Sequence, residues 1–213
     1  MIEVKNLHYA YNANNSFVFP DMICREADQW LIKGESGCGK TTFLHLVAGL
    51  QKPAVGEIFI NNVDINKLAI SEADKYRGNE IGIVFQKHHF IRSLNVAENL
   101  KLARYLVDKK ITEKEIFDLL GRLHLDDKFK SPISSLSQGE LQRLSIARAI
   151  INAPSVLLAD EPTSSLDDKH CKEAIELLCA EASRNNTILL VVTHDLRLSP
   201  FFENQLNLNM AKQ

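Results

Sequence analysis

The sequence predicts an α/β fold built on a parallel sheet, and two observations support this prediction. Short apolar segments alternate with segments of helical pattern along the 213 residues, an order that places helices on the faces of a sheet. Two apolar segments, VLLAD (156–160) and TILLVV (187–192), show no polar alternation. Continuous apolar runs of this length are typical of parallel strands that are covered on both faces.

The elements follow from local patterns. Strands are expected at 2–7, 30–33, 57–60, 81–85, 156–160 and 187–192, and helices at 40–50, 96–107, 113–123, 138–152 and 168–184. Asn61-Asn62 tolerates the positive φ angles of a tight turn, so 57–65 is expected to form a hairpin. Capping pairs precede three of the helices: Asn95 with Glu98, Thr112 with Glu115, and Ser137 with Glu140. Residues 87–135 show no strand pattern, which indicates a helical lobe inserted into the α/β body.

Composition bounds the function class. The chain is 45% hydrophobic and 24% charged with a formal net charge of −2, so a globular domain without a nucleic-acid partner is expected. No signal peptide is recognisable in MIEVKNLHYA, and no apolar run approaches the roughly 20 residues that span a bilayer. The four cysteines (Cys24, Cys38, Cys171, Cys179) form no CxxC and are expected to be reduced thiols. His88 and His89 lack further ligand spacing, so no metal site is expected there.

The segment GESGCGKT (34–41) fits the phosphate-binding pattern G-x-x-x-x-G-K-[ST] between an expected strand and an expected helix. Its glycines allow the backbone N–H groups to point at a phosphate, and Lys40 is expected to meet the β- and γ-phosphates. The Thr41 hydroxyl is an oxygen ligand suited to Mg²⁺. A glycine turn with a chance lysine is the alternative, which the flanking elements disfavour. The expected ATP-binding residues are Tyr11, Gly34, Glu35, Ser36, Gly37, Cys38, Gly39, Lys40, Thr41 and Thr42.

Polar side chains end three of the apolar strands: Gln86, the pair Asp160 and Glu161, and His194. In open α/β sheets ligands bind at the carboxyl edge of the strands. We expect Asp160 to hold Mg²⁺ and Glu161 to orient or deprotonate an attacking water, with the Gln86 amide reaching the metal or the water. Each residue has an ordinary alternative, such as an acidic turn before a helix. Together with the phosphate-binding loop, they favour a catalytic site.

SLSQGE (135–140) predicts a second anion seat, that is, a helix start whose backbone N–H groups can bind an anion. Ser137 is expected to cap this helix, and Gly139, which has no side chain, leaves the N–H groups of the first turn accessible. With Tyr11, the loop 34–42, Gln86, VLLADE (156–161), SSLD (164–167) and His194, this segment resembles the ATP-binding cassette (ABC) ATPase family over essentially the whole chain. The resemblance implies a P-loop NTPase (RecA-like) parallel-sheet core, an N-terminal antiparallel β subdomain and an inserted helical subdomain at about 87–152, within one nucleotide-binding domain spanning 1–213.

The same resemblance implies roles for individual residues. Tyr11 is expected to stack on adenine, Glu161 to be the catalytic base, and His194 to switch at the γ-phosphate, while Gln86 senses Mg²⁺. The metal ligands are then Thr41, Gln86 and Asp160. The signature is Ser137, Gln138 and Gly139, and the D-loop is Ser164, Ser165, Leu166 and Asp167. In this family the signature of one subunit covers the ATP of the other, so the expected partners are a second copy of the chain and integral membrane permease subunits.

Two residues depart from the usual L-S-G-G-Q signature: Gln138 replaces a glycine and Glu140 replaces the glutamine. SEADKYRGNEIGIVFQ (71–86) is similar to the lipoprotein-release and macrolide-export branch, which implies a cytoplasmic subunit on the inner face of the membrane, with FIRSL (90–94) as its expected contact. The alternatives are a mechanotransmitting cell-division member of the branch, a cassette ATPase acting on DNA or ribosomes, and a small-molecule kinase. The DNA-repair members need a long coiled coil within this part of the chain, and residues 42–136 show no heptad pattern. The translation factors carry two cassettes per chain, whereas this chain has one. A small-molecule kinase would leave LSQGE and His194 without a role.

Overall fold

The computed structural model describes residues 1–12 and 15–208, and its strands form two sheets. The antiparallel sheet has the order β2-β1-β5-β6, with β3 also pairing with β1. Its strands are β1 (Ile2–Asn12), β2 (Asn15–Val18), β3 (Met22–Cys24), β5 (Val55–Ile60) and β6 (Val63–Asp64). Asn61 and Asn62 have φ angles of 48° and 65° between β5 and β6, which confirms the predicted hairpin.

The second sheet is parallel, in the order β10-β4-β9-β8-β7. Its strands are β4 (Gln29–Lys33), β7 (Ile81–Val84), β8 (Val156–Asp160), β9 (Ile188–Thr193) and β10 (Asn204–Asn207). Every residue of β8 and β9 is buried, because helices or the other sheet cover both faces. The predicted α/β class with a parallel sheet is confirmed.

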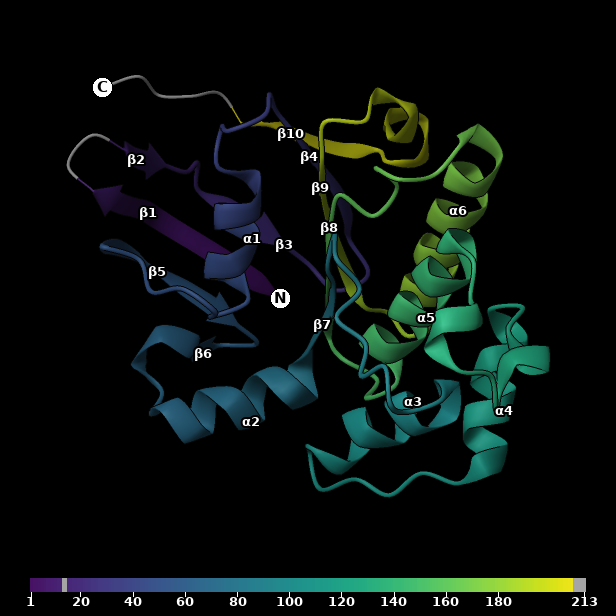
Figure 1. Ribbon diagram of the computed structural model, residues 1–213. Helices are drawn as coiled ribbons and strands as arrows, with labels where there is room; N and C mark the ends of the chain where they lie inside the picture. The colour runs from purple at the N-terminus through teal and green to yellow at the C-terminus, as the bar shows by residue number, and fades with distance from the viewer. Residues whose placement is uncertain (13–14, 209–213) are drawn as a thin grey trace.

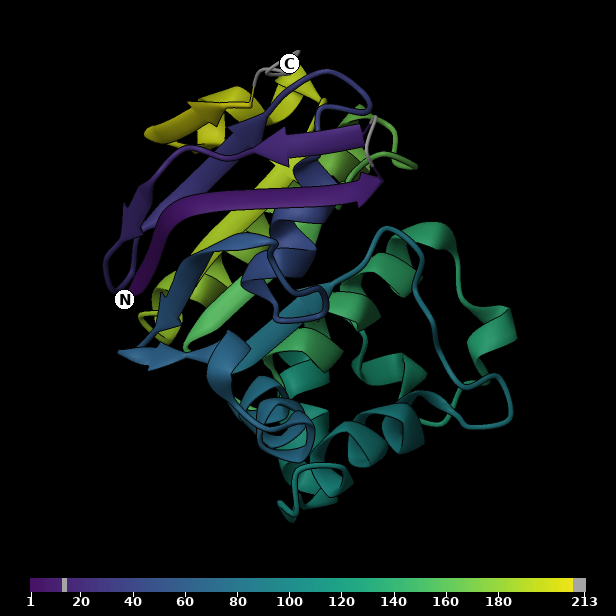
Figure 2. The same ribbon diagram turned by 90° about the vertical axis from the view of Figure 1, so that its left-hand side faces the viewer.

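Helix α1 (Lys40–Val47) lies between the two sheets, and α5 (Gln138–Ile150) and α6 (Asp168–Arg184) cover the opposite face of the parallel sheet (Figure 1). One apolar core, which includes Ile2, Phe43 and Ile58, fills the space around α1. A second core, which includes Leu144, Leu157 and Ile175, fills the space between the parallel sheet and α5 and α6. On the other side of the parallel sheet, strands β1 and β2 pass over α1 (Figure 2).

The segment between β7 and α5 is helical, as predicted. It contains α3 (Val96–Tyr105), α4 (Glu113–Arg122) and the short 3₁₀ turns Asp126–Lys128 and Ile133–Ser135. All three predicted capping boxes are present, and each helix starts directly after its cap. In Figures 1 and 2 this helical part lies beside the sheets, away from the antiparallel strands.

The structure also contains elements that the sequence did not predict. Helix α2 (Ile70–Glu80) buries none of its residues, so its sequence lacks the apolar stripe that marks an amphipathic helix. Strands β2, β3 and β10 are short and follow no strong alternation. Two further 3₁₀ turns, Ile65–Lys67 and Leu196–Phe201, connect neighbouring elements.

Candidate functional site

Residues of the site come together at the carboxyl edge of the parallel sheet. Strand register pairs Lys33 of β4 with Thr193 of β9, Val192 with Asp160, and Ala159 with Val84. Chain segments that leave these strands therefore start side by side. They carry the phosphate-binding loop, the two carboxylates, His194 and Gln86, as the sequence predicted from strand ends.

The loop 34–39 ends in a glycine that no other residue can replace without strain. Gly39 is the N-cap of α1 with φ 98°, and a Cβ built there would lie 2.6 Å from the ring of Phe17. Gly37 has φ 84°, so the loop needs glycine in the left-handed region at both positions. The first turn of α1 carries no acidic side chain. Its N–H groups and dipole form an anion-binding site.

The Lys40 ammonium is buried among oxygen atoms of the same loop. Its Nζ donates hydrogen bonds to the carbonyl oxygens of Gly34 (2.8 Å) and Glu35 (3.0 Å) and lies 3.8 Å from Oε1 of Glu161. Only 7% of the side chain is exposed. An ammonium donates strong, charge-assisted hydrogen bonds to phosphate oxygens, and this one lies within the loop whose backbone N–H groups can bind an anion.

Two oxygen ligands for a hard cation stand next to each other at the start of α1. The Thr41 hydroxyl donates to Oδ1 of Asp160 at 3.1 Å. Burial raises the pKa of the Asp160 carboxyl, and the hydrogen bond from Thr41 opposes this shift. Hydroxyl, carboxylate and amide oxygens are the ligands that Mg²⁺ takes alongside substrate phosphates, so Thr41, Asp160 and Gln86 fit this cation. Over residues 1–12 and 15–208, no group of three or more His, Cys, Asp or Glu side chains is placed to hold a metal ion without a substrate.

Glu161 is held in an unusual backbone conformation by several hydrogen bonds. Its φ is 47°, a region that costs energy for a residue with a side chain and recurs at functional sites. Its N–H donates to the carbonyl of Val192 at 2.9 Å. Its carboxylate accepts from the Thr193 hydroxyl (2.7 Å) and from the His194 backbone N–H (3.2 Å), and lies 2.8 Å from His194 Nδ1.

Most of these residues line one hollow of about 400 Å³, and Asp160 lies behind Thr41 without lining it. Its lining comprises Tyr11, Phe17, Ser36, Gly37, Gly39, Lys40, Thr41, Thr42, Gln86, Glu161 and His194. Gly34 and Glu35 reach the site through their carbonyls, while Cys38 is buried, with its Sγ 2.4 Å from where a Cβ on Gly34 would lie. The structure thus assembles most of the predicted ATP-binding residues around one space.

Phe17, beside Tyr11 at the aromatic end of the hollow, is a lining residue that the sequence analysis missed. The Tyr11 hydroxyl shares a hydrogen bond with Thr42 (3.1 Å) and accepts one from Gln51 (3.3 Å). The ring of Phe17 lies edge-on to Tyr11 with centroids 6.3 Å apart. Phe17 carries no motif, and only the pairing of β1 with β2 brings it beside Tyr11 and the loop.

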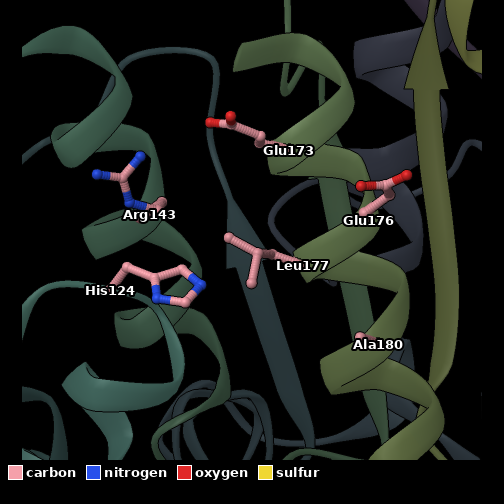
Figure 3. A pocket seen from close by; sticks show the side chains of 6 residues that line it. All are labelled: His124, Arg143, Glu173, Glu176, Leu177 and Ala180. Atoms are coloured by element: carbon pink, nitrogen blue, oxygen red, sulfur yellow. The ribbon is translucent and has the colours of Figure 1, made fainter. Parts of the chain in front are cut away.

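A second hollow, of about 570 Å³, lies between α5 and α6 (Figure 3). Its lining is His124, Arg143, Glu173, Glu176, Leu177 and Ala180. None of these is a predicted site residue, and the lining has no glycine loop or lysine to hold a triphosphate. The smaller hollow beside Lys40 therefore fits a phosphate-bearing ligand better than this one.

The predicted signature lies apart from that hollow. Ser137 Oγ accepts from the Glu140 N–H (3.3 Å), and Glu140 Oε2 accepts from the Ser137 N–H (2.7 Å). The side chain of Gln138 forms a hydrogen bond with His88, which follows Gln86 in the chain. This hydrogen bond opposes the effect of burial, which lowers the pKa of His88. Among the residues that the structure describes, none of 137–139 lines the hollow around Lys40. The hollow around Lys40 and the predicted anion seat at the start of α5 therefore do not meet within the described part of the chain.

The predicted D-loop connects the carboxylates to α6. The Ser164 hydroxyl donates to the carbonyl of Glu161 at 3.2 Å. Asp167 caps α6, accepting from the His170 N–H at 2.9 Å. Ser165 is exposed and Leu166 packs against the second core. The segment therefore starts at the candidate base and ends at a helix start.

A parallel sheet with a glycine-lysine loop and two carboxylates at its carboxyl edge defines a P-loop nucleoside triphosphatase. The family model described as ABC transporter matches residues 20–164. The lipoprotein-releasing system ATP-binding protein LolD of Buchnera aphidicola subsp. Schizaphis graminum is 41% identical over 175 residues, 81% of this chain and 76% of that protein. LolD of Colwellia psychrerythraea is 38% identical over 83% of this chain and 69% of that protein.

Solved structures agree with these relatives. A dimeric post-hydrolysis state of the ATP-binding cassette MJ0796 bound to ADP and Pi has a TM-score of 0.88 and 30% identity, covering 98% of this chain and 94% of that chain. The CbiO1 protein of Clostridium perfringens, part of the ABC transporter complex CbiONQ, has a TM-score of 0.87 and 26% identity, covering 98% and 84%. The chain belongs to the ABC transporter family and is an ATP-hydrolysing cassette of that family.

Proposed function

We propose that this cassette closes on a second copy of itself around ATP and drives a separate membrane subunit. The observation that carries the proposal is the separation of the two anion seats described above. The loop at Gly39 and Lys40 and the capped start of α5 at Ser137 both offer N–H groups to an anion, yet they share no hollow within the described part of the chain. A head-to-tail pair of chains brings each seat to the other chain's nucleotide.

The residues of the hollow supply the parts that phosphoryl transfer to water requires. Lys40 and the loop amides bind the β- and γ-phosphates, and Tyr11 stacks on the base. Glu161 accepts the proton of the attacking water, and His194, whose Nδ1 is 2.8 Å from Glu161, orients the γ-phosphate. Thr41, Asp160 and Gln86 hold Mg²⁺, which supplies charge neutralisation at the phosphates.

The helical part, residues 87–152, transmits the change to a partner. Arg148 of α5 donates to the carbonyls of His88 (2.6 Å) and His89 (2.8 Å) and lies over the ring of Phe90 at 4.5 Å. The segment after Gln86 is therefore fixed to the helix that carries the signature. Within this segment the Ile91 side chain is 47% exposed. We propose that FIRSL (90–94) binds a segment of the membrane subunit.

The named relatives indicate the kind of membrane subunit. Both relatives are named as ATP-binding proteins of a lipoprotein-releasing system, so we infer a partner that extracts or exports lipid-linked or hydrophobic cargo. Among the helices of residues 1–12 and 15–208, none is long and apolar enough to cross a bilayer. Independently of that finding, we propose that the cassette works on the cytoplasmic face through its partner, and that residues 1–213 belong to one nucleotide-binding domain.

The test measures ATP-dependent dimerisation when hydrolysis is blocked. In a Glu161→Gln chain, light scattering is expected to show doubling of the mass with ATP and Mg²⁺ and none with ADP. Adding Gly139→Glu should abolish the doubling, because a carboxylate in the α5 anion seat repels the phosphates. A Cβ at Gly139 meets only ordinary contacts at 3.5 Å, and Glu is favourable in a first helical turn, so the chain still folds and binds ATP.

Gly121→Glu is the matched control, since a Cβ on this α4 residue meets nothing within 4 Å. It should leave dimerisation unchanged. A Glu161→Gln chain that stays monomeric at saturating ATP would contradict the proposal. So would a Gly139→Glu chain that dimerises as well as its control.

A further inference from the structure

The turn that follows His194 is joined to the D-loop by one arginine. Arg197 Nε donates to Oδ1 (2.9 Å) and Oδ2 (3.0 Å) of Asp195, and its NH2 group donates to Oδ2 at 2.7 Å. Its NH1 group pairs with Asp168 Oδ1 at 2.5 Å, and NH2 reaches the carbonyl of Leu166 at 3.4 Å. The fork of the guanidinium thus contacts the residue after His194, the D-loop residue Leu166, and Asp168, which directly follows the D-loop.

The same contacts continue to the candidate base. The backbone N–H of Asp195 donates to Thr193 Oγ1 at 2.9 Å, and that hydroxyl donates to Glu161 at 2.7 Å. Thr163, directly before the D-loop, donates to Asp195 Oδ2 at 3.1 Å. Asp195 therefore lies between the base and the D-loop. A hydrogen-bonded chain runs from Glu161 through Thr193, Asp195 and Arg197 to Asp168.

Stability does not account for the outer part of this chain. The side chain of Asp168 is 90% exposed and that of Arg197 is 41% exposed, and ion pairs at such sites contribute little to the free energy of unfolding. Asp195, by contrast, is 11% exposed. The arginine holds a mostly buried carboxylate on one side and reaches a solvent-exposed segment on the other.

We propose that Arg197 is a positioning residue that couples the D-loop to His194 and Glu161 within the same chain. The proposal rests on the proposed function, in which the D-loop meets the second copy and His194 meets the γ-phosphate. A shift of the D-loop on pairing then changes the turn at Asp195, and the imidazole of His194 moves with it. Arg197 itself is not among the residues that line the hollow around Lys40.

The test compares Arg197→Ala, Arg197→Lys and Asp168→Asn with Arg184→Ala. Arg184 ends α6 and has no ion pair or hydrogen bond through its side chain in the described structure. Arg197→Ala is expected to lower kcat roughly tenfold, with ATP affinity within about twofold of the unsubstituted chain. The melting temperature is also expected to fall, because the mostly buried Asp195 loses its partner, so kcat is compared well below the melting temperatures of all variants. Lysine should restore part of kcat, since it keeps the charge and loses the fork.

Asp168→Asn should lower kcat less, and adding it to Arg197→Ala should have no further effect, because both act through one contact. An Arg197→Ala kcat within about twofold of the Arg184→Ala control would overturn the proposal. So would a fall in kcat matched by an equal loss of ATP affinity, or additive effects of the two substitutions.

A second readout needs no turnover. In ¹⁵N-histidine spectra, Arg197→Ala is expected to shift the imidazole signals of His194, assigned with His194→Ala, while Arg184→Ala leaves them in place. Unshifted signals would overturn the coupling. If the unsubstituted chain itself hydrolysed no ATP, the proposed function would fail, and the spectra would still decide whether Arg197 positions His194.

Discussion

The imidazole Nδ1 of His194 lies 2.8 Å from Oε1 of Glu161, although the two residues leave different strands. The Thr193 hydroxyl contacts the other oxygen of the same carboxylate at 2.7 Å. These contacts and the His194 backbone N–H fix the orientation of the carboxylate, and a general base must lie in a fixed position within hydrogen-bond reach of the proton that it accepts.

Glu161→Gln is expected to lower kcat by a factor of about 10²–10⁴, because the amide keeps the shape of the side chain and cannot accept a proton. ATP binding, measured by calorimetry, should be unchanged. Glu203→Gln is the control, since Glu203 is exposed and does not line the hollow around Lys40. Full turnover in the Glu161→Gln chain would exclude Glu161 as the base.

Lys40→Ala is expected to weaken ATP binding about 100-fold, because the charge-assisted hydrogen bonds to the phosphates are lost. Isothermal calorimetry with ATP measures this directly. Lys75→Ala, on the exposed helix α2, should bind as the unsubstituted chain does. Equal affinities in the two variants would show that the loop is not the nucleotide cradle.

Arg122→Ala is expected to destabilise the chain by about 2–3 kcal/mol. Arg122 Nε and NH2 donate to the two oxygens of Glu181 at 3.0 and 3.2 Å, and the Glu181 side chain is only 7% exposed. Removing the arginine leaves a buried carboxylate unpaired between α4 and α6. Urea unfolding measures the change.

The exposed pair of Lys101 and Glu113, at 2.9 Å, provides the comparison. Lys101→Ala should cost less than about 1 kcal/mol, because water replaces the ammonium. If both variants lost the same free energy of unfolding, burial of Glu181 would not be the cause.

Stability should depend on pH through the cap of α5. Hydrogen bonding from the Ser137 N–H lowers the pKa of Glu140. A carboxyl whose folded-state pKa lies below its unfolded value of about 4.3 stabilises the fold above that value. This contribution is lost as the pH falls through the folded-state pKa.

The matched variant is Glu140→Gln, which keeps a hydrogen-bonding side chain without the charge. It is expected to be less stable than the unsubstituted chain by about 0.5 kcal/mol at pH 7, because the charge at the helix start is lost. Urea unfolding should show the same difference in the free energy of unfolding between the two chains at pH 7 and pH 5. The difference should be smaller at pH 4, below the unfolded-state pKa of about 4.3. A difference that widened on acidification would contradict the assignment.

Elements with strong local signals were predictable. The interior runs of β8 and β9 and the capped helices α3, α4 and α5 match their predictions to within a few residues. Helix α2 was not predicted, since none of its residues is buried and no apolar periodicity marks it. Strand β10 depends on pairing with β4, more than 170 residues away in sequence, so its short segment carries little local information.

The same division holds for the site. Gly39, Lys40, Asp160 and Glu161 lie in contiguous motifs whose chemistry is legible in the sequence, and the structure brings them to one edge. Phe17 and Arg197 carry no motif. Phe17 reaches the loop only through strand pairing, and Arg197 reaches Asp168 only because β9 ends beside the segment that follows β8.

The sequence by itself determined the α/β class, the glycine loop and the order of polar residues at the strand ends, because these depend on residues adjacent in the chain. Only the tertiary structure decided that Thr193 and His194 share the carboxylate of Glu161, and that Ser137 stays outside the hollow around Lys40 within the described residues. Such contacts depend on strand register and helix packing, which bring together groups that local propensity does not relate.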